Sequence, residues 1–202
     1  MKIGLFGGTF DPIHNAHLFV AESARISEGL DRVLFLPANH QQYRERSTIP
    51  PEHRCAMILA AIDANPAFSL DTTDLEPDAT GYTADLLPRL RAKYPDAEFT
   101  FIIGADSLVN ATWVRFDDVL NALERFVIAP RAGALHDALA RALAAVPAQF
   151  RERIGTLNLP ELPESSSLVR SLLGQHRSTR YLMPDAVWNY IVAHKLYEIE
   201  ST

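Results

Sequence analysis

The chain has a single cysteine, Cys55, among its 202 residues. One thiol can form no disulfide within the chain and cannot by itself hold a structural zinc, so we expect a reducing, cytoplasmic location. The chain also lacks any apolar run close to the roughly 20 residues that a membrane-spanning helix needs. Its first residues reach Asp11 before a signal-peptide core could form. We therefore expect neither a leader nor a membrane partner.

Positive charge is in deficit, with 19 Lys and Arg residues against 25 Asp and Glu residues and a net charge of −6. Binding to nucleic acid without regard to sequence needs a basic field, so we expect no nucleic-acid partner, although a local basic pocket remains compatible with this charge. The 48% of hydrophobic residues is enough for one sizeable core. Because internal repeats and low-complexity linkers are missing, we expect a single domain over residues 1–202, with 160–202 as its helical C-terminal part. A homo-oligomer is compatible with the sequence.

Short apolar runs alternate with segments of helical periodicity. We expect strands at residues 2–6, 32–37, 68–75, 98–103, 125–129 and 154–159. We expect helices at residues 17–27, 51–64 (with Met57, Leu59 and Ile62 inward), 82–93, 116–123, 135–145, 167–173 and 184–194. This order predicts an α/β fold with a Rossmann-like, doubly wound parallel sheet. Ligands of such sheets bind beyond the carboxyl ends of the strands, where the polar residues of this chain should converge on one crevice.

The segment from Gly7 to His17 joins the first strand to the first helix and reads Gly-Gly-Thr-Phe-Asp-Pro-Ile-His-Asn-Ala-His. Its two glycines let the backbone approach a phosphate closely. His14 and His17, three residues apart, can lie on one side of the turn, where unpaired N–H groups of the helix already favour an anion. The alternative is an ordinary strand-to-helix turn. Zinc is disfavoured because no further ligands are close in sequence, and we predict no metal site built by the chain.

Two further strings suit a nucleotide. Ser166, Ser167 and Arg170 place hydroxyls and a forked, permanently charged donor at the start of an expected helix, which suits phosphate oxygens. A plain helix cap with a solvated arginine is the alternative. Gly104 and Asp106 follow the fourth strand, where the carboxylate can accept hydrogen bonds from ribose hydroxyls or cap the next helical turn.

The Gly7–His17 string resembles the HxGH signature of the nucleotidyltransferase superfamily, and its full form resembles bacterial nicotinate mononucleotide adenylyltransferases. Ala16 stands where that family usually has glycine. The Ser-Ser-Ser-Leu-Val-Arg string ending at Arg170 is similar to the family motif Ile-Ser-Ser-Thr-x-Ile-Arg, which closes over the phosphates of ATP. The resemblance spans nearly the whole chain and implies the nucleotidyltransferase fold.

The resemblance implies transfer of AMP from ATP, with Mg²⁺, to the phosphate of nicotinate mononucleotide, which gives nicotinate adenine dinucleotide and pyrophosphate. Trp113 would stack on the nicotinate ring, although a tryptophan also commonly fills core volume. Tyr82 and Thr83 would present backbone groups to the nicotinate carboxylate. The implied catalytic residues are His14, His17 and Arg170; the implied ATP-binding residues are Gly7, Gly8, Thr9, Phe10, Gly104, Asp106, Ser166 and Ser167; the implied acceptor-binding residues are Tyr82, Thr83, Trp113 and Arg44.

The loop after the second expected strand departs from the family. The family has Pro-Pro-His followed by Lys or Arg, and this chain has Gln41, Gln42, Tyr43 and Arg44. The cation is kept, whereas the prolines and the histidine are lost. One alternative is therefore an adenylyltransferase for another acceptor, such as nicotinamide mononucleotide or phosphopantetheine. Another is a noncatalytic nucleotide sensor, which the joint presence of His14, His17 and Arg170 disfavours.

Overall fold

The computed structural model describes residues 1–38, 49–130, 136–144, 146–160 and 162–197. One parallel sheet has the strand order β3-β2-β1-β4-β5-β6. Its strands are β1 (Lys2–Gly8), β2 (Arg32–Pro37), β3 (Phe68–Leu70), β4 (Glu98–Gly104), β5 (Arg125–Ala129) and β6 (Ile154–Thr156). The order reverses between β1 and β4, which is the point where doubly wound sheets bind their ligands. The predicted α/β class and parallel sheet are confirmed.

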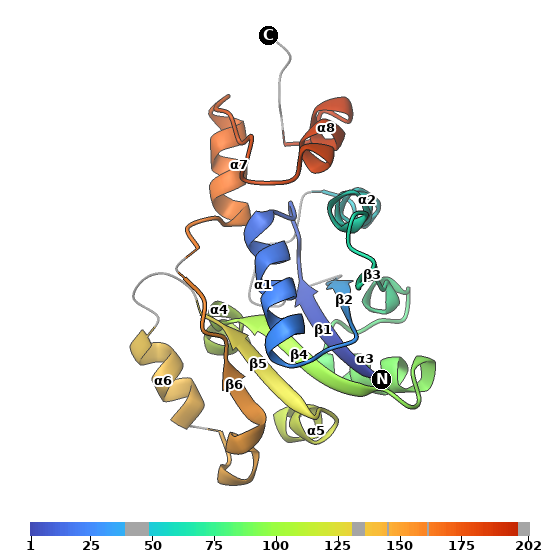
Figure 1. Cartoon of the computed structure of the whole chain (residues 1–202), viewed down its shortest axis with the longest axis vertical. Helices are drawn as coiled ribbons and strands as arrows, with labels where there is room; N and C mark the ends of the chain where they lie inside the picture. Colours follow the sequence, from blue (N-terminus) through green and yellow to red (C-terminus); the bar gives the residue numbers. More distant parts are fainter. Residues whose placement is uncertain (39–48, 131–135, 145, 161, 198–202) are drawn as a thin grey trace.

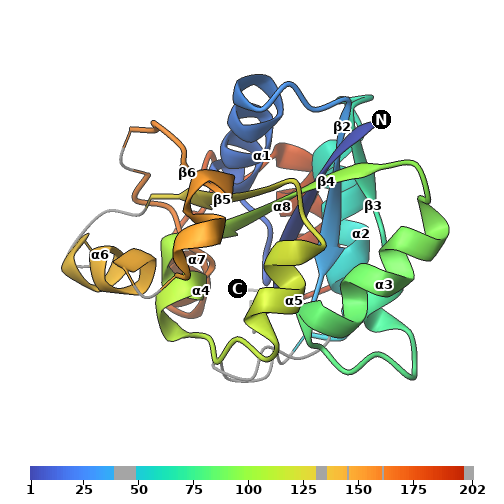
Figure 2. The ribbon, with the colours of Figure 1, turned by 90° about the horizontal axis from the view of Figure 1, so that it is seen from below.

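The helices cover both faces of the sheet. They are α1 (Asn15–Ser27), α2 (Pro51–Ile62), α3 (Thr83–Lys93), α4 (Ala105–Asn110), α5 (Phe116–Asn121), α6 (His136–Ala144), α7 (Ser166–Gly174) and α8 (Asp185–Ala193), with 3₁₀ turns η1 (Thr73–Leu75) and η2 (Ala148–Arg153). Figure 2 shows α1 on one side of the sheet and α3 and α5 on the other. No helix within the described ranges is long and apolar enough to cross a membrane.

Alternate residues of β1 supply the two halves of the core. Ile3 and Leu5 pack with residues of α3, α4 and α5, whereas Phe6 packs with residues of α1, α2, α7 and α8. The half of the core that contains Phe6 also includes Val169 of α7 and Ile191 of α8. The C-terminal helices, which lie together at one end of the molecule (Figure 1), therefore share apolar packing with the sheet. The single-domain extent over residues 1–202 stays a prediction.

Several element boundaries differ from the sequence predictions. The strand expected at 68–75 ends at Leu70, and the first helix begins at Asn15 rather than 17. The short elements α4 and η2, of six residues each, were not predicted. Leu59 is 52% exposed, so its predicted inward position is wrong. The predicted loop at 38–50 lies largely outside the described residues.

Asp71 explains why β3 is short. One of its carboxylate oxygens, Oδ1, accepts hydrogen bonds from the backbone N–H (3.0 Å) and the hydroxyl (2.6 Å) of Thr73, which turns the chain out of the sheet. The other oxygen, Oδ2, accepts from Lys93 Nζ (2.8 Å) and the Tyr94 hydroxyl (3.0 Å). Burial raises the pKa of Asp71, but the hydrogen bonds from Lys93, Thr73 and Tyr94 outweigh burial and hold the pKa below its ordinary value.

We predict that Asp71→Asn lowers the free energy of unfolding by about 1–3 kcal/mol at pH 7, because the ionised acceptor is lost. Because the folded-state pKa is depressed, this stabilisation is complete well above the unfolded pKa of about 3.9 and is lost as the pH falls through the folded-state pKa. Urea unfolding at pH 7 and near pH 3 measures the difference between the two proteins, which should narrow in acid. Exposed Asp96→Asn is the control, and a difference that stays constant with pH would contradict this account.

Candidate active site

The loop between β1 and α1 lies at the switch point of the sheet and is shaped by Phe10. The Phe10 ring is 1% exposed and packs against the rings of Phe6, Phe35 and His17, with centroids 5.1 to 5.6 Å apart. A Cβ on Gly8 would lie 2.8 Å from the Phe10 ring, so only glycine fits there. The Phe10 side chain therefore belongs to the core. Only its backbone, with φ +50°, is placed to act in the predicted ATP site.

The loop brings the two predicted catalytic histidines together. The rings of His14 and His17 are stacked, with centroids 3.7 Å apart and an interplanar angle of 30°. The backbone N–H of His14 donates to His17 Nδ1 at 3.2 Å. In a neutral His17 ring the proton then sits on Nε2, which makes Nε2 a donor suited to a phosphate oxygen. His17 is half-buried and His14 is 2% exposed, so His17 is the better placed of the two to touch a substrate.

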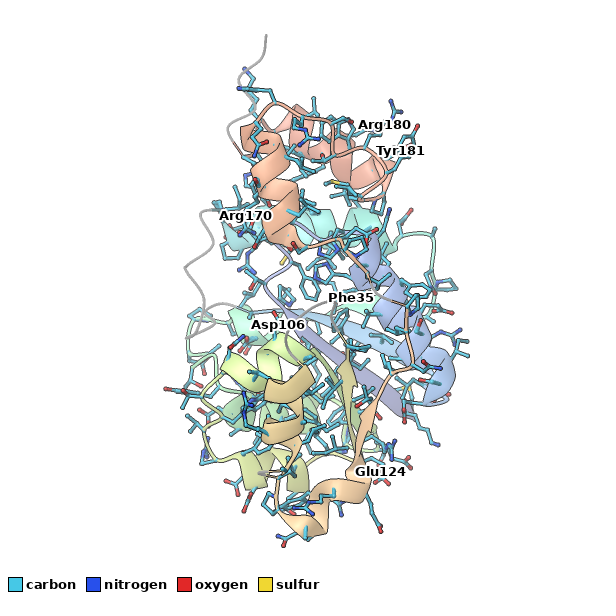
Figure 3. The ribbon with its side chains drawn as sticks, turned by 90° about the vertical axis from the view of Figure 1, so that its left-hand side faces the viewer. Phe35, Asp106, Glu124, Arg170, Arg180 and Tyr181 are labelled. Carbon is cyan, nitrogen blue, oxygen red and sulfur yellow. The ribbon has the colours of Figure 1, made fainter. Side chains whose placement is uncertain are left out.

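Helix α7 attaches to this loop through the predicted phosphate residues. Arg170 Nη1 donates to the carbonyl oxygen of Asp11 at 2.6 Å and lies 4.0 Å from Asp11 Oδ2. The Ser166 hydroxyl donates to the carbonyl oxygen of Pro12 at 2.9 Å. Figure 3 shows Arg170 on the part of the molecule formed by the C-terminal helices and Asp106 on the part formed by the sheet. Glu124 lies at the other end of the sheet. The hydrogen bond to Asp11 thus places Arg170 at the loop that follows the carboxyl end of β1.

The three consecutive serines have different tasks. Ser165 is the N-cap of α7, and its hydroxyl accepts from the backbone N–H of Leu168 at 3.1 Å. The hydroxyl of Ser166 is committed to the loop, while Ser167 is exposed and its hydroxyl lies 3.4 Å from Arg170 Nη2. Of the two serines predicted to bind ATP, Ser167 is therefore the one whose hydroxyl stands beside the arginine at the surface.

Residues on either side of α8 also bind the loop after β1 and the start of α1. Asn15 at the start of α1 donates through its backbone N–H to the carbonyl of Leu182 (2.9 Å) and through its side chain to the carbonyl of Tyr181 (2.7 Å). The Tyr197 hydroxyl donates to Asp11 Oδ1 at 2.7 Å. We refer to the residues of 166–197 that bond to residues 11–15 as the C-terminal clasp.

Arg54 on α2 is a site residue that the sequence analysis missed. Its side chain is 2% exposed, and Nη1 donates to the carbonyl oxygens of Thr9 (2.7 Å) and Ala38 (2.9 Å). It thereby ties the loop after β1 to the end of β2. Burial lowers the pKa of Arg54 and the nearby Asp11 carboxylate partly offsets this, so the side chain stays charged at neutral pH. The sequence offered one indication that Arg54 is buried: on a helix it lies three residues before Met57, which was predicted to point inward, so the two residues share a face.

A pocket opens between the loop and α3. Gly7 and Gly8, predicted to bind phosphate, line it together with three residues predicted to bind the acceptor nucleotide, Tyr82, Thr83 and Trp113. The lining residues are Gly7, Gly8, Leu36, Ala38, Asp74, Gly81, Tyr82, Thr83, Leu86, Phe101, Ile103, Ser107, Ala111, Thr112, Trp113 and Val114. Thr83 is the first residue of α3, whose N-terminal N–H groups favour an anion. None of these lining side chains is a cation, so the donors available here to an acidic ligand are backbone N–H groups and the hydroxyls of lining residues such as Thr83.

Trp113 packs against aromatic residues of the core and also lines the pocket. Its ring contacts Phe116 and Phe126, with centroids 5.1 and 5.5 Å apart. Its Nε1 is buried without a hydrogen-bond acceptor among the described residues. The ring is thus fixed by aromatic neighbours, which suits a stacking surface.

The remaining predicted residues lie beside the pocket or outside the described residues. Gly104 ends β4 and precedes α4, and Asp106 lies within the first turn of α4 rather than at its N-cap, which is Gly104. This excludes the capping alternative for Asp106. Arg44 lies outside the described residues. Within the described ranges, no three His, Cys, Asp or Glu side chains gather in a way that could hold a metal ion.

Comparisons with known proteins agree with the geometry. The family model described as cytidylyltransferase-like matches residues 5–192. A "Probable nicotinate-nucleotide adenylyltransferase" of Lachnoclostridium phytofermentans is 37% identical over 198 residues, covering 97% of this chain and 98% of the relative. The "Nicotinate-nucleotide adenylyltransferase" of Bacillus subtilis is 33% identical over 199 residues, covering 98% of each chain.

Two solved structures share the fold. They are the Plasmodium falciparum nicotinic acid mononucleotide adenylyltransferase complexed with APC, with a TM-score of 0.76, and the same protein complexed with NaAD, with a TM-score of 0.74. Each is 20% identical in sequence and covers 98% of both chains. At that identity the likeness shows the fold alone.

We predict that Ser165→Ala lowers the free energy of unfolding by about 1 kcal/mol, because the cap of α7 is lost. If that cap also orients Arg170, the variant will weaken the binding of an ATP analogue a few-fold, which isothermal titration measures. Ser171→Ala, on the exposed side of the same helix, is the matched control. Lower stability with unchanged nucleotide affinity would show that the cap does not orient Arg170.

Proposed function

This chain belongs to the cytidylyltransferase-like family and, within it, to the nicotinate-nucleotide adenylyltransferases, and we propose that its crevice carries out their reaction. It transfers AMP from ATP to the phosphate of nicotinate mononucleotide, giving nicotinate adenine dinucleotide and pyrophosphate in NAD biosynthesis. The observation that supports this best is the position of Gly7 and Gly8. They belong both to the loop suited to phosphates and to the pocket suited to an acidic aromatic ring.

The nucleophile, the phosphate of nicotinate mononucleotide, is already negatively charged at neutral pH. A phosphate monoester has a second pKa near 6 and is largely dianionic at neutral pH, so the chain needs no general base. One acceptor oxygen forms a bond to the α-phosphorus of ATP while the bond from that phosphorus to the β-phosphate oxygen breaks and pyrophosphate leaves. The task of the protein is then to position the two nucleotides and to stabilise the developing negative charge.

The charge-stabilising groups are those of the loop and α7. Nε2 of His17 donates to an oxygen of the α-phosphoryl group, and His14 supports it through the stacked ring. Arg170 and Ser167 lie where they can hold the departing pyrophosphate. The backbone N–H groups at the start of α3 and the Trp113 ring receive the nicotinate carboxylate and ring. These roles are our assignments.

The metal and the cellular location are part of the proposal. Mg²⁺ keeps several waters and binds mainly to substrate phosphates with one or two protein carboxylates, so a chain whose described residues build no metal cage fits a metal that arrives with ATP. Asp106, in the first turn of α4, keeps the role that we expect for it toward the ribose hydroxyls of ATP and is not assigned to the metal. When bound, the metal neutralises phosphate charge. We place the reaction in the cytoplasm, in keeping with the single Cys55 and the use of ATP.

The direct test measures pyrophosphate release from ATP and Mg²⁺ with nicotinate mononucleotide, nicotinamide mononucleotide and phosphopantetheine as separate acceptors. We expect turnover with the nicotinate acceptor, because the α3 N-terminus offers donors to a carboxylate. Preferred turnover with another acceptor would keep the chemistry and refute the proposed specificity. ATP binding without turnover of any acceptor would favour the nucleotide sensor.

We predict that His17→Ala lowers kcat by a factor of about 10² to 10³, as expected when a donor to the transition state is removed. His194→Ala, an exposed histidine on the C-terminal segment, should keep kcat near that of the parent protein. Steady-state kinetics with nicotinate mononucleotide measures both. If His17→Ala stays within a few-fold of the parent, His17 does not have the assigned role.

A further inference from the structure

Tyr197 links the end of the chain to the loop of the site. Its hydroxyl donates to Asp11 Oδ1 at 2.7 Å, across 186 positions of sequence. Burial raises the pKa of Tyr197, and the Asp11 carboxylate raises it further. The phenol is therefore a neutral and constant hydrogen-bond donor at physiological pH.

Asp11 is held from several sides. It is 5% exposed, and a buried carboxylate is costly unless it is paired. Tyr197 binds one of its oxygens, the Arg170 guanidinium lies 4.0 Å from the other, and the charge of Arg54 attracts it. The hydrogen bond from Tyr197 restrains the orientation of this carboxylate. That orientation sets where negative charge stands relative to Arg170, whose Nη1 also binds the Asp11 carbonyl oxygen.

A second tyrosine of the C-terminal segment provides a comparison. The Tyr190 hydroxyl lies 2.9 Å from His53 Nδ1, so it joins α8 to α2 by one hydrogen bond. That bond fastens the C-terminal helix without touching the loop at 11–14. The C-terminal segment is therefore attached to the rest of the fold through Tyr190 as well, so the hydrogen bond from Tyr197 to Asp11 is not needed for that attachment alone.

We propose that Tyr197 is a positioning residue for AMP transfer, which acts through the Asp11 carboxylate to hold Arg170 and the 11–14 loop in the arrangement that binds the triphosphate of ATP. The inference rests on the proposed function and deepens it. Tyr197 is not among the described residues that line the acceptor pocket. Its effect reaches the nucleotide only through Asp11 and Arg170, and it concerns ATP rather than the acceptor, whose pocket is lined by other residues.

The test is Tyr197→Phe, which removes one oxygen atom and keeps the ring. We expect kcat/KM for ATP to fall about tenfold, as for loss of one hydrogen bond to a charged group, while KM for nicotinate mononucleotide stays within about twofold. Tyr190→Phe is the matched control, which loses a hydroxyl of the same segment and should keep kcat/KM near that of the parent. Thermal unfolding of both variants checks the fold. Equal kinetics for the two variants would overturn the proposal.

A double-mutant cycle tests the route through Asp11. In an Asp11→Ala background, Tyr197→Phe should cause no further loss of kcat/KM for ATP, because its partner is already gone. If the two losses multiply, Tyr197 does not act through Asp11. Should Tyr197→Phe fail to fold, Asp11→Ala alone must show the loss confined to ATP, and a loss shared equally by both substrates would overturn the proposal.

Titration with an ATP analogue separates this inference from the proposed function. Tyr197→Phe should bind the analogue about tenfold more weakly than the parent, whichever acceptor the enzyme uses. If the parent protein turns over no nicotinate mononucleotide, the proposed function fails while this binding difference still tests Tyr197. Unchanged affinity in Tyr197→Phe, together with normal turnover by the parent, refutes the inference alone.

Discussion

The hold of the C-terminal clasp on residues 11–15 is the interaction on which the rest of the site depends. The loop after β1 has little regular structure of its own, and two of its carbonyl oxygens are bound by Arg170 and Ser166. Arg54 binds a third carbonyl, that of Thr9, from beneath. Because these donors come from α2 and α7, the shape of the loop depends on helices that lie far from it in the sequence. The two stacked histidines inherit their position from it.

Two arginines place positive charge at the loop after β1. The chain as a whole has a net charge of −6, yet Arg54 and Arg170 both bind the loop after β1, and the Asp11 carboxylate interacts with both. Two arginines near one loop create a local positive field that suits phosphate groups, even though the net charge of the chain is negative. The neighbouring pocket has no cationic side chain among its described lining residues, so in our proposal the two nucleotides are recognised by different groups.

Local patterns predicted most of the fold, and long-range contacts account for what was missed. Continuous apolar strands indicated the parallel sheet, and the glycines with His14 and His17 marked the crevice. Arg54 and Tyr197 could not be assigned, because their partners lie 45 and 186 positions away and neither belongs to a local motif. Phe10 was predicted to bind ATP as part of the glycine loop, and sequence alone does not reveal that its ring packs inward on Phe35.

The central claim is that one crevice receives both nucleotides, with the phosphates at the His17 loop and the pyridine ring in the pocket beneath α3. A crystal structure of the protein with nicotinate adenine dinucleotide tests it most directly. The account predicts the nicotinate ring against Trp113, its carboxylate at the N-terminus of α3, and the adenylyl phosphate within hydrogen-bond distance of His17. A pyridine ring bound outside this pocket, or phosphates distant from the loop, would contradict it.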